Sequence, residues 1–267
     1  MTTWIDANAW SGQFPFRRIA GTTVEELERK LSRLGFTGAV LSPLEAIFQE
    51  DSYGAEEALC HDIQGRTEQL QDVWHFKVVN PACNWWERDL RKSVEALGVS
   101  GIRLCPTFHG YQLADACVAD LLVAAGELNL PVQVMCKMQD WRIEWMMATS
   151  DVEIDQVGPF LEGAGDHPLI LSGLHTTDLR GVSKQLAERS NVLVDTSRLK
   201  GSWRTLEKLA ETISLDRLCF GSLWPINLPD CPLAQIGAAD IPQLQKDAIM
   251  GSSIMRILGN GPKGGPA

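Results

Sequence analysis

The chain has 267 residues, a net charge of −10 at pH 7, 45% hydrophobic residues and 22% charged residues. These proportions are ordinary for a globular protein, and the acidic balance excludes the basic surface by which proteins bind nucleic acid or anionic membranes. No stretch approaches the ~18 consecutive apolar residues of a membrane span. A chain of this length builds one large domain or two small ones, and we expect one.

The seven cysteines predict a reducing compartment. Their number is odd and no two stand in a Cys-x-x-Cys pair, so the sequence indicates neither a disulfide framework nor a zinc knuckle. Several of them, such as Cys105 and Cys219, lie inside apolar runs, where a free cysteine acts as a small hydrophobic residue. The first residues show no basic region followed by an apolar block. We therefore predict a cytoplasmic protein.

Short apolar runs alternate with amphipathic segments along the whole chain. The first strand is expected at 4–8, and a helix follows at 22–34, capped by Thr22 or Thr23 and favoured by Glu25 and Glu26 in its first turn. Further strands are expected at 37–42, 74–80, 101–105, 132–135, 169–171, 192–195 and 218–220. Further helices are expected at 53–64, 85–97, 114–128, 152–161, 178–190, 203–213 and 241–258.

Eight strand–helix repeats predict a (β/α)8 TIM barrel, in which parallel strands are covered by helices on the outside. We expect a single domain over residues 1–258 and a flexible tail, rich in glycine and proline, at 259–267. Barrel enzymes place their chemistry at the C-terminal ends of the strands. The polar residues that follow the predicted strands are therefore the candidates for a functional site.

Motifs at these strand ends resemble one family, in the same order along the chain. They are Trp4-Ile-Asp-Ala-Asn-Ala-Trp-Ser-Gly12, Val78-Val-Asn-Pro81, Gly101-Ile-Arg-Leu-Cys-Pro106 with His109-Gly-Tyr111, Leu130-Pro-Val132, Val194-Asp-Thr-Ser197 and Phe220-Gly-Ser-Leu-Trp-Pro225. The chain is similar to the amidohydrolase-related group of metal-dependent hydrolases (amidohydrolase 2 type), which are (β/α)8 barrels. The resemblance implies a metal-dependent site at the mouth of the barrel.

The metal-binding positions that the resemblance implies are changed in this chain. The family's two histidines of the first strand are matched by Asn8 and Trp10, those of the fifth and sixth strands by Met135 and Gly173, and the aspartate of the eighth strand by Leu223. None of these residues holds zinc as imidazoles and a carboxylate do. We therefore expect no metal, no other cofactor and no metal-dependent hydrolysis.

Titratable residues near the strand ends keep other chemistry open. Zinc or another divalent metal in a non-standard site of His109, Cys136 and His175 is one alternative. A rebuilt hydrolase or decarboxylase site is another, with His109, His175 and Asp195 as candidate catalytic residues, because histidine exchanges protons near neutral pH. The opposing interpretation is that His109 and Tyr111 only pin their loop to Arg103 or to the barrel rim.

The remaining strand-end residues predict a small-molecule site. Arginine suits a carboxylate or phosphate, and tryptophan suits planar rings or sugars, so we expect an anionic or carbohydrate-like ligand. The structural alternatives are an amide bonded within the barrel, tryptophans that fill the space of a lost metal site, and solvated surface charges. The residues expected to contact the ligand are Asn8, Trp10, Arg17, Arg103, Tyr111, Lys137 and Trp224.

Whether the protein is an enzyme stays open at this point. The leading hypothesis is an amidohydrolase-like barrel without the metal, non-catalytic or metal-independent, that binds its ligand at the C-terminal mouth. The competing hypothesis is the rebuilt hydrolase or decarboxylase, and a third is a structural subunit of a partner enzyme. The expected partner is a small molecule, with no nucleic acid and no membrane, and assembly into a homo-oligomer is left open.

Overall fold

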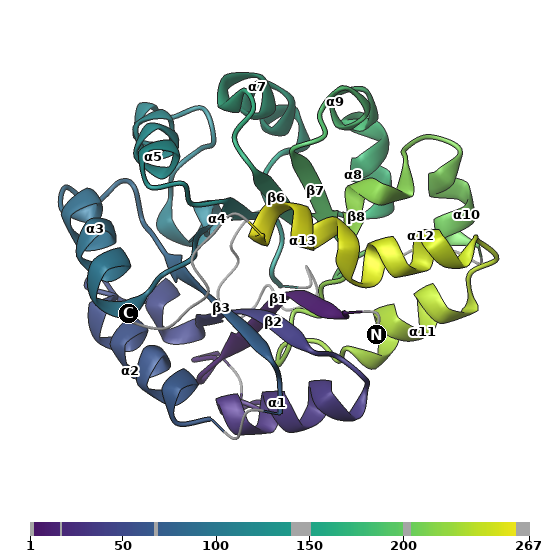
Figure 1. The fold of residues 1–267 in the computed structure, drawn as a ribbon. Coiled ribbons are helices and arrows are strands. Elements are labelled where there is room, and N and C mark those ends of the chain that lie inside the picture. The colour runs from purple at the N-terminus through teal and green to yellow at the C-terminus, as the bar shows by residue number, and fades with distance from the viewer. Residues whose placement is uncertain (1–2, 17, 67–68, 140–150, 200–203, 260–267) are drawn as a thin grey trace.

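The fold is a barrel of eight parallel strands. The computed structural model describes residues 3–16, 18–66, 69–139, 151–199 and 204–259. One sheet runs in the order β1-β2-β3-β4-β5-β6-β7-β8 (Figure 1). The strands are β1 (Ile5–Ser11), β2 (Gly38–Pro43), β3 (Asp72–Val78), β4 (Gly101–Leu104), β5 (Val132–Met135), β6 (Leu169–Ser172), β7 (Val192–Asp195) and β8 (Leu218–Cys219).

The two edges of the sheet meet at β1. The Ala7 N–H donates to the Phe220 carbonyl and the Trp10 N–H to the Trp224 carbonyl, both at 2.8 Å. These bonds bring the segment around β8 against β1, so the sheet is nearly closed. The predicted (β/α)8 barrel is confirmed.

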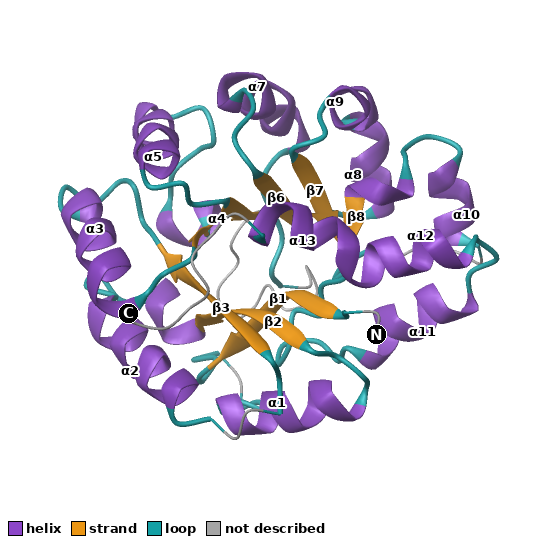
Figure 2. Ribbon diagram, in the orientation of Figure 1, coloured by secondary structure: helices purple, strands orange, loops and turns teal. Residues whose placement is uncertain are grey.

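Helices alternate with the strands and cover the outside of the barrel (Figure 2). They are α1 (Val24–Arg33), η1 (Leu44–Ile47), α2 (Tyr53–Gln64), α3 (Trp86–Leu97), α4 (Pro106–His109), α5 (Ala116–Glu127), α7 (Ile154–Ala164), α8 (Thr176–Gly181), α9 (Ser183–Glu188), α10 (Thr205–Ala210), η3 (Leu215–Arg217), α11 (Asp230–Ala238), α12 (Gln243–Asp247), η4 (Ala248–Ser252) and α13 (Ser253–Leu258). From residue 260 on, the predicted tail lies outside the described residues.

Local sequence signals place the first helix. The Thr23 hydroxyl accepts the Glu26 N–H at 3.2 Å, and the Glu26 carboxylate accepts the Thr23 N–H at 3.2 Å. This capping box satisfies two N–H groups for which the helix itself has no partner. Leu27 and Leu31, four residues apart on one face, are fully buried in the core. The predicted cap at Thr23 is therefore observed.

Two predicted helices are interrupted. The segment expected as one helix at 178–190 forms α8 and α9, which separate at Val182, where φ is −116° and ψ is 12°. The C-terminal segment begins as α12, widens into the π-helical turn η4 and continues as α13. Gly251 lies in this turn, and a Cβ atom there would come 1.8 Å from the Thr3 carbonyl oxygen. The missing side chain lets the helix lie directly against the start of β1.

Side chains that point into the barrel form three layers. The lowest layer, toward the N-terminal ends of the strands, is apolar. Helix α13 crosses this end of the barrel in Figure 1 and closes it with Ile254, Ile257 and Leu258. The middle layer is polar, and the top layer at the C-terminal ends of the strands is apolar again. Residues at the alternate strand positions pack outward on the helices. The lowest layer contains Ile5, Ala7, Val40, Trp74, Phe76, Ile170, Leu193 and Cys219.

Strand β1 departs from regular alternation. Its register against β2 shifts between Asp6 and Ala9. Ala7 belongs to the lowest layer, and Trp10, three residues later, belongs to the top layer. An irregularity of this kind re-aims the side chains that follow it, so Asn8 and Trp10 both face the barrel.

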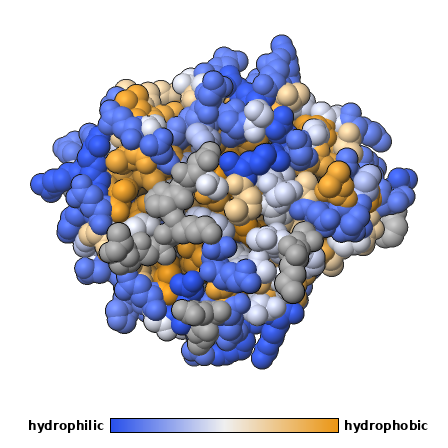
Figure 3. All heavy atoms as spheres, in the orientation of Figure 1, coloured by the Kyte–Doolittle hydropathy of each residue, from blue (hydrophilic) through white to orange (hydrophobic). Residues whose placement is uncertain are grey.

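The molecular surface is largely polar on the face shown in Figure 3. Hydrophilic side chains cover most of the helical rim, and hydrophobic patches lie between neighbouring helices. No helix in the described ranges combines the length and apolar character needed to cross a membrane.

Candidate functional site

The middle layer of the barrel is a buried polar network. Asn8, Arg103, Gln133, Ser172 and Asp195 come from five different strands, and none of them is exposed (0% each). The Asn8 amide donates to Asp195 at 2.7 Å, Arg103 to the Gln133 side chain at 2.9 Å, and the Gln133 amide to the Ser172 hydroxyl at 2.7 Å. The bond from Asn8 to Asp195 joins the first and seventh strands, and the other two bonds join neighbouring strands inside the barrel.

Asp195 is held by donors on both of its oxygens. One oxygen accepts from Asn8. The other accepts the Ser197 N–H at 3.0 Å, the Ser197 hydroxyl at 2.6 Å and the Gly173 N–H at 3.4 Å. Charge-assisted bonds of this kind fix the orientation of a carboxylate. Asp195, a predicted catalytic residue, thus anchors the buried network.

Arg103 carries the positive charge of this network. Its Nη1 atom donates to the Ala9 carbonyl at 3.0 Å, and the guanidinium lies 4.2 Å from the centre of the Trp10 ring. Burial lowers the pKa of Arg103 from 12.5 to about 10, which leaves the group charged at neutral pH. The Trp10 ring covers this charge through a cation–π contact. Arg103, expected to contact a ligand, is covered by the protein itself.

Asp6 lies where β1 meets the segment after β8. Its Oδ1 atom accepts the N–H groups of Asn8 at 3.0 Å and Ser222 at 2.9 Å. Burial raises the pKa of Asp6 from 3.8 to about 6, although the hydrogen bonds from Ser222 and Asn8 lower it. Its Oδ2 atom has no hydrogen-bond partner in the described part of the chain. Asp6 therefore holds the barrel seam and carries a buried charge at neutral pH.

An apolar top layer closes the mouth above the polar network. Trp10 and Leu223 have no exposed surface, and Met135 is 2% exposed. The Trp10 indole N–H donates to the Asn8 amide oxygen at 3.0 Å. The layer contains Trp10, Phe14, Leu44, Ala46, Ile47, Val78, Cys105, Met135, Met138 and Leu223.

Two backbone positions at the mouth have restricted conformations. Leu223 has φ 59°, in the left-handed region that leucine disfavours and that aspartate and asparagine adopt more readily. Gly173 has φ 81°, and a Cβ atom there would lie 2.0 Å from the Lys137 carbonyl oxygen. The backbone after β5 therefore excludes any side chain at position 173.

The three predicted catalytic residues belong to different sets of contacts. The His109 ring is half-buried with Nε2 3.1 Å from the Ile47 carbonyl oxygen, and burial lowers its pKa from 6.5 to about 4. The His175 N–H donates to the Asp178 carboxylate at 2.8 Å, at the start of α8. Asp195 lies in the barrel network. His109 is thus tied to the loop after β2, and His175 to the beginning of its own helix.

Candidates for a non-standard metal site are not assembled in the described ranges. These ranges contain no group of three or more His, Cys, Asp or Glu side chains placed to hold one metal ion. Cys136 is fully buried, and burial raises the pKa of its thiol far above the ordinary value. A buried neutral thiol is a poor nucleophile and a poor metal ligand.

Lys137 is paired with two carboxylates. Its Nζ atom lies 3.2 Å from Asp178 and 3.3 Å from Asp151. Burial lowers the pKa of Lys137, but the two carboxylates raise it by more, so the net shift is upward. The amine is therefore a cation and not a desolvated nucleophile.

The other predicted ligand residues at the rim are turned inward or lie outside the described ranges. Tyr111 is 7% exposed, and burial raises the pKa of its hydroxyl well above 10. The Trp224 indole N–H donates to the Gly21 carbonyl at 2.8 Å. Arg17 lies outside the described residues.

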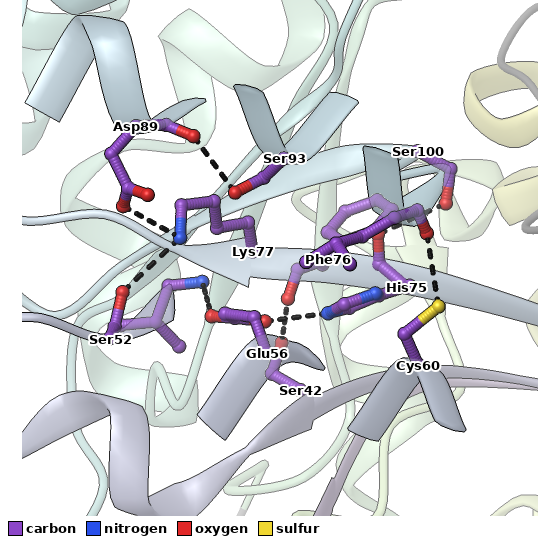
Figure 4. Close-up of polar contacts among 12 residues, drawn as sticks. Ser42, Ser52, Glu56, Cys60, His75, Phe76, Lys77, Asp89, Ser93 and Ser100 are labelled. Carbon is purple, nitrogen blue, oxygen red and sulfur yellow. Dashed lines mark hydrogen bonds and ion pairs between the residues drawn. The ribbon is translucent and has the colours of Figure 1, made fainter. Parts of the chain in front are cut away.

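A second buried network, which no sequence motif revealed, lies between β3 and the helices α2 and α3 (Figure 4). His75 Nε2 lies 2.6 Å from a Glu56 carboxylate oxygen, and Lys77 Nζ lies 2.9 Å from Asp89 and 3.2 Å from the Ser52 hydroxyl. The signal in the sequence is two ionisable residues at alternate positions of an apolar strand. These bonds tie one strand to two helices, which is a structural role.

A cavity of about 740 Å³ lies between the segments that follow β7 and β8. Thr196, Ser197 and Leu199 line it after β7, Arg204 and Leu206 around the start of α10, and further residues of the segment 226–239 close the other side. No sequence motif marks these residues, and none of them is among the candidates predicted from the sequence. The cavity is at the end of the barrel where TIM-barrel ligands bind.

Comparisons with known proteins agree with this fold. The chain resembles 2,6-dihydroxybenzoate decarboxylase in complex with 2,6-dihydroxybenzoate, with 14% identity, a TM-score of 0.70, and 97% of this chain and 100% of that chain covered. It also resembles a dihydroxybenzoic acid decarboxylase from Polaromonas sp. JS666 with bound manganese, with 15% identity, a TM-score of 0.68, and 97% of each chain covered. A third similar structure is 5-carboxyvanillate decarboxylase from Sphingomonas paucimobilis, with 10% identity, a TM-score of 0.69, and 97% of this chain and 100% of that chain covered.

The sequence match carries the assignment, since identities this low establish the fold alone. No curated protein sequence matches the chain. Residues 86–259, more than half of the chain, match the amidohydrolase family. The chain belongs to the amidohydrolase family.

Proposed function

We propose that this barrel has replaced the family's central metal site with apolar packing and serves as a metal-independent, non-catalytic binding protein for a small anionic molecule. The observation that carries the proposal is the top layer of the barrel. Trp10, Met135 and Leu223, which match three of the implied ligand positions, pack in one buried cluster. A metal ion at this point would meet an indole, a thioether and an alkyl group, none of them a ligand set for zinc or manganese.

The two remaining positions support the same proposal. Both polar ends of the Asn8 amide are bonded, its nitrogen to Asp195 and its oxygen to Trp10. At position 173 the backbone leaves no room for an imidazole, because even a Cβ atom would overlap the Lys137 carbonyl. The residues present therefore do not fit the metal that the family implies.

The alternative is a hydrolase or decarboxylase that uses His109, His175 and Asp195. Its support is the structural likeness to decarboxylases, one of them with bound manganese. Catalysis by this set requires a histidine that takes up a proton near neutral pH and reaches the reacting group. Burial lowers the pKa of His109 to about 4, and the ring faces the Ile47 carbonyl. The observed contacts favour the binding protein.

The decisive experiment measures metal and activity together. Protein purified without chelator is analysed for zinc, manganese and iron, and its melting temperature is recorded with added Mn²⁺ and with EDTA. We expect far less than one equivalent of metal, no change in melting temperature with either addition, and no decarboxylation of 2,6-dihydroxybenzoate or 5-carboxyvanillate. One equivalent of metal whose removal abolishes a measured activity would overturn the proposal.

A further inference from the structure

We infer that the cavity between the β7 and β8 segments is the ligand site of this barrel, and that it takes a small carboxylate with an apolar body. The inference rests on the proposed binding function and gives it a location and a ligand class. A volume of about 740 Å³ is within the range of small-molecule sites. The barrel centre, by contrast, is filled by the Trp10 layer.

The walls of the cavity are mainly apolar. Leu199, Leu206, Ile226, Pro232 and Ala239 line it, and these side chains form a surface for a hydrocarbon or ring. No aromatic side chain is among its described lining residues, so the stacking platform that sugars use is missing from this part of the chain. The described walls therefore suit a ligand with an apolar body.

Two oppositely charged side chains, Arg204 and Glu207, are among the described lining residues, and Arg204 is the positive one. Its side chain is 57% exposed, and its Nε atom lies 3.9 Å from the Glu207 carboxylate, beyond hydrogen-bond distance. The Glu207 carboxylate already accepts the Asp240 N–H at 2.9 Å. Within the described part of the chain the guanidinium makes no hydrogen bond, so its fork has donors for a ligand carboxylate.

The cavity is connected to the polar interior through Ser197. This residue lines the cavity, and its hydroxyl and N–H both donate to Asp195, which in turn bonds Asn8. Ser197, at the start of the segment after β7, is therefore fixed in position by the buried network. A cavity wall fixed in this way loses less conformational entropy on binding.

The test uses the full chain, treated with EDTA, and three probes: octanoate, 1-octanol and glucose. Binding is measured by calorimetry and by the rate at which iodoacetamide alkylates Cys231, an exposed cysteine that lines the cavity. We expect saturable octanoate binding that protects Cys231, weaker binding of 1-octanol, and none of glucose.

Arg204→Gln should weaken octanoate binding about tenfold and leave 1-octanol binding unchanged. Arg33→Gln, an exposed charge on α1, is the matched control and should change neither.

A second pair of variants tests the position of the site. Ala238→Trp places a large ring in the cavity from an exposed position and should abolish binding of octanoate and of 1-octanol. Ala234→Trp, exposed on the same helix but not in the cavity wall, should bind as the unmodified chain does. Equal binding by the two tryptophan variants, no octanoate binding by the unmodified chain, or binding of glucose in place of octanoate would each overturn the inference.

The outcome also separates this inference from the proposed function. Octanoate binding that appears only after Mn²⁺ is added would contradict the metal-independent function as well. If metal-free protein binds no octanoate, that result contradicts only the assignment of this cavity as the ligand site and leaves the proposed function in place.

Discussion

The Trp10 indole N–H donates to the Asn8 amide oxygen at 3.0 Å, so the two residues that the family resemblance matches to a metal-binding pair bond to each other. The amide nitrogen of Asn8 donates to Asp195 at 2.7 Å. The Trp10 ring also covers the Arg103 guanidinium. The Trp10 side chain thus closes the mouth of the barrel, orients the Asn8 amide and shields the Arg103 charge.

Trp10→Phe should destabilise the protein by roughly 3 kcal/mol, measured by urea unfolding. The variant keeps an aromatic ring but leaves the buried Asn8 oxygen without its donor and weakens the contact with Arg103. Trp85→Phe is the control, since Trp85 is 36% exposed, and we expect a change within about 0.5 kcal/mol. Equal effects of the two substitutions would show that the Trp10 bond contributes no stability.

Leu223→Asp restores the carboxylate that the family resemblance implies at this position. The backbone there has φ 59°, which suits aspartate better than leucine. The side chain, however, would carry a charge into the apolar top layer, and we expect a loss of about 3–5 kcal/mol in urea unfolding. Leu228→Asp, at a position 57% exposed, should change stability by less than about 0.5 kcal/mol.

Manganese provides the second readout for Leu223→Asp. Because Asn8, Trp10 and Met135 remain, we expect added Mn²⁺ to leave the unfolding curve of this variant unchanged. Recovery of the lost stability with Mn²⁺ would mean that a single carboxylate completes a metal site, which contradicts the proposed function.

Gly173→Ala tests whether position 173 can hold a side chain at all. A Cβ atom there would lie 2.0 Å from the Lys137 carbonyl oxygen, so the backbone after β5 must move. Gly110→Ala is a close control, because its φ of 73° resembles the 81° of Gly173 but nothing lies within 4 Å of its Cβ position. We expect a loss of about 1 kcal/mol for Gly110→Ala and at least about 3 kcal/mol for Gly173→Ala. Similar melting temperatures for the two variants would contradict this.

The strands could be predicted from the sequence because each is a short apolar run between helices. Their outward side chains pack on helices and their inward ones fill the barrel, so both faces are apolar except at the polar middle layer, and each run stands out. Strand β4, expected at 101–105, is Gly101–Leu104. The break between α8 and α9 could not be predicted, since it depends on the backbone conformation at Val182.

Side-chain partners in the candidate site were beyond prediction for a different reason. Arg103 bonds Gln133 thirty residues away, and His109 faces a carbonyl 62 residues away. The sequence places Arg103 on a strand near the barrel mouth but does not show which group it meets. The cavity beside β7 and β8 carries no motif, because Arg204 and Asn227 come to line the same cavity only when the barrel closes.

Asp6 and His109 should give opposite pH dependences of stability. Burial raises the pKa of Asp6 from 3.8 to about 6, so its folded form holds the proton more tightly than the unfolded chain. Its contribution is fully present below pH 3.8 and is lost as pH rises through 6, about 3 kcal/mol in all. Burial lowers the pKa of His109 from 6.5 to about 4, so its contribution is present above pH 6.5 and is lost as pH falls through 4.

Two variants separate these contributions, each compared with the unmodified chain by urea unfolding from pH 4 to pH 8. Asp6→Asn keeps an oxygen for the N–H groups of Asn8 and Ser222 but removes the buried charge. Its stability relative to the unmodified chain should therefore improve as pH rises. His109→Gln removes the group that resists protonation, so its relative stability should improve as pH falls. Difference curves that are flat, or that slope the same way, would show that burial does not set these two pKa values.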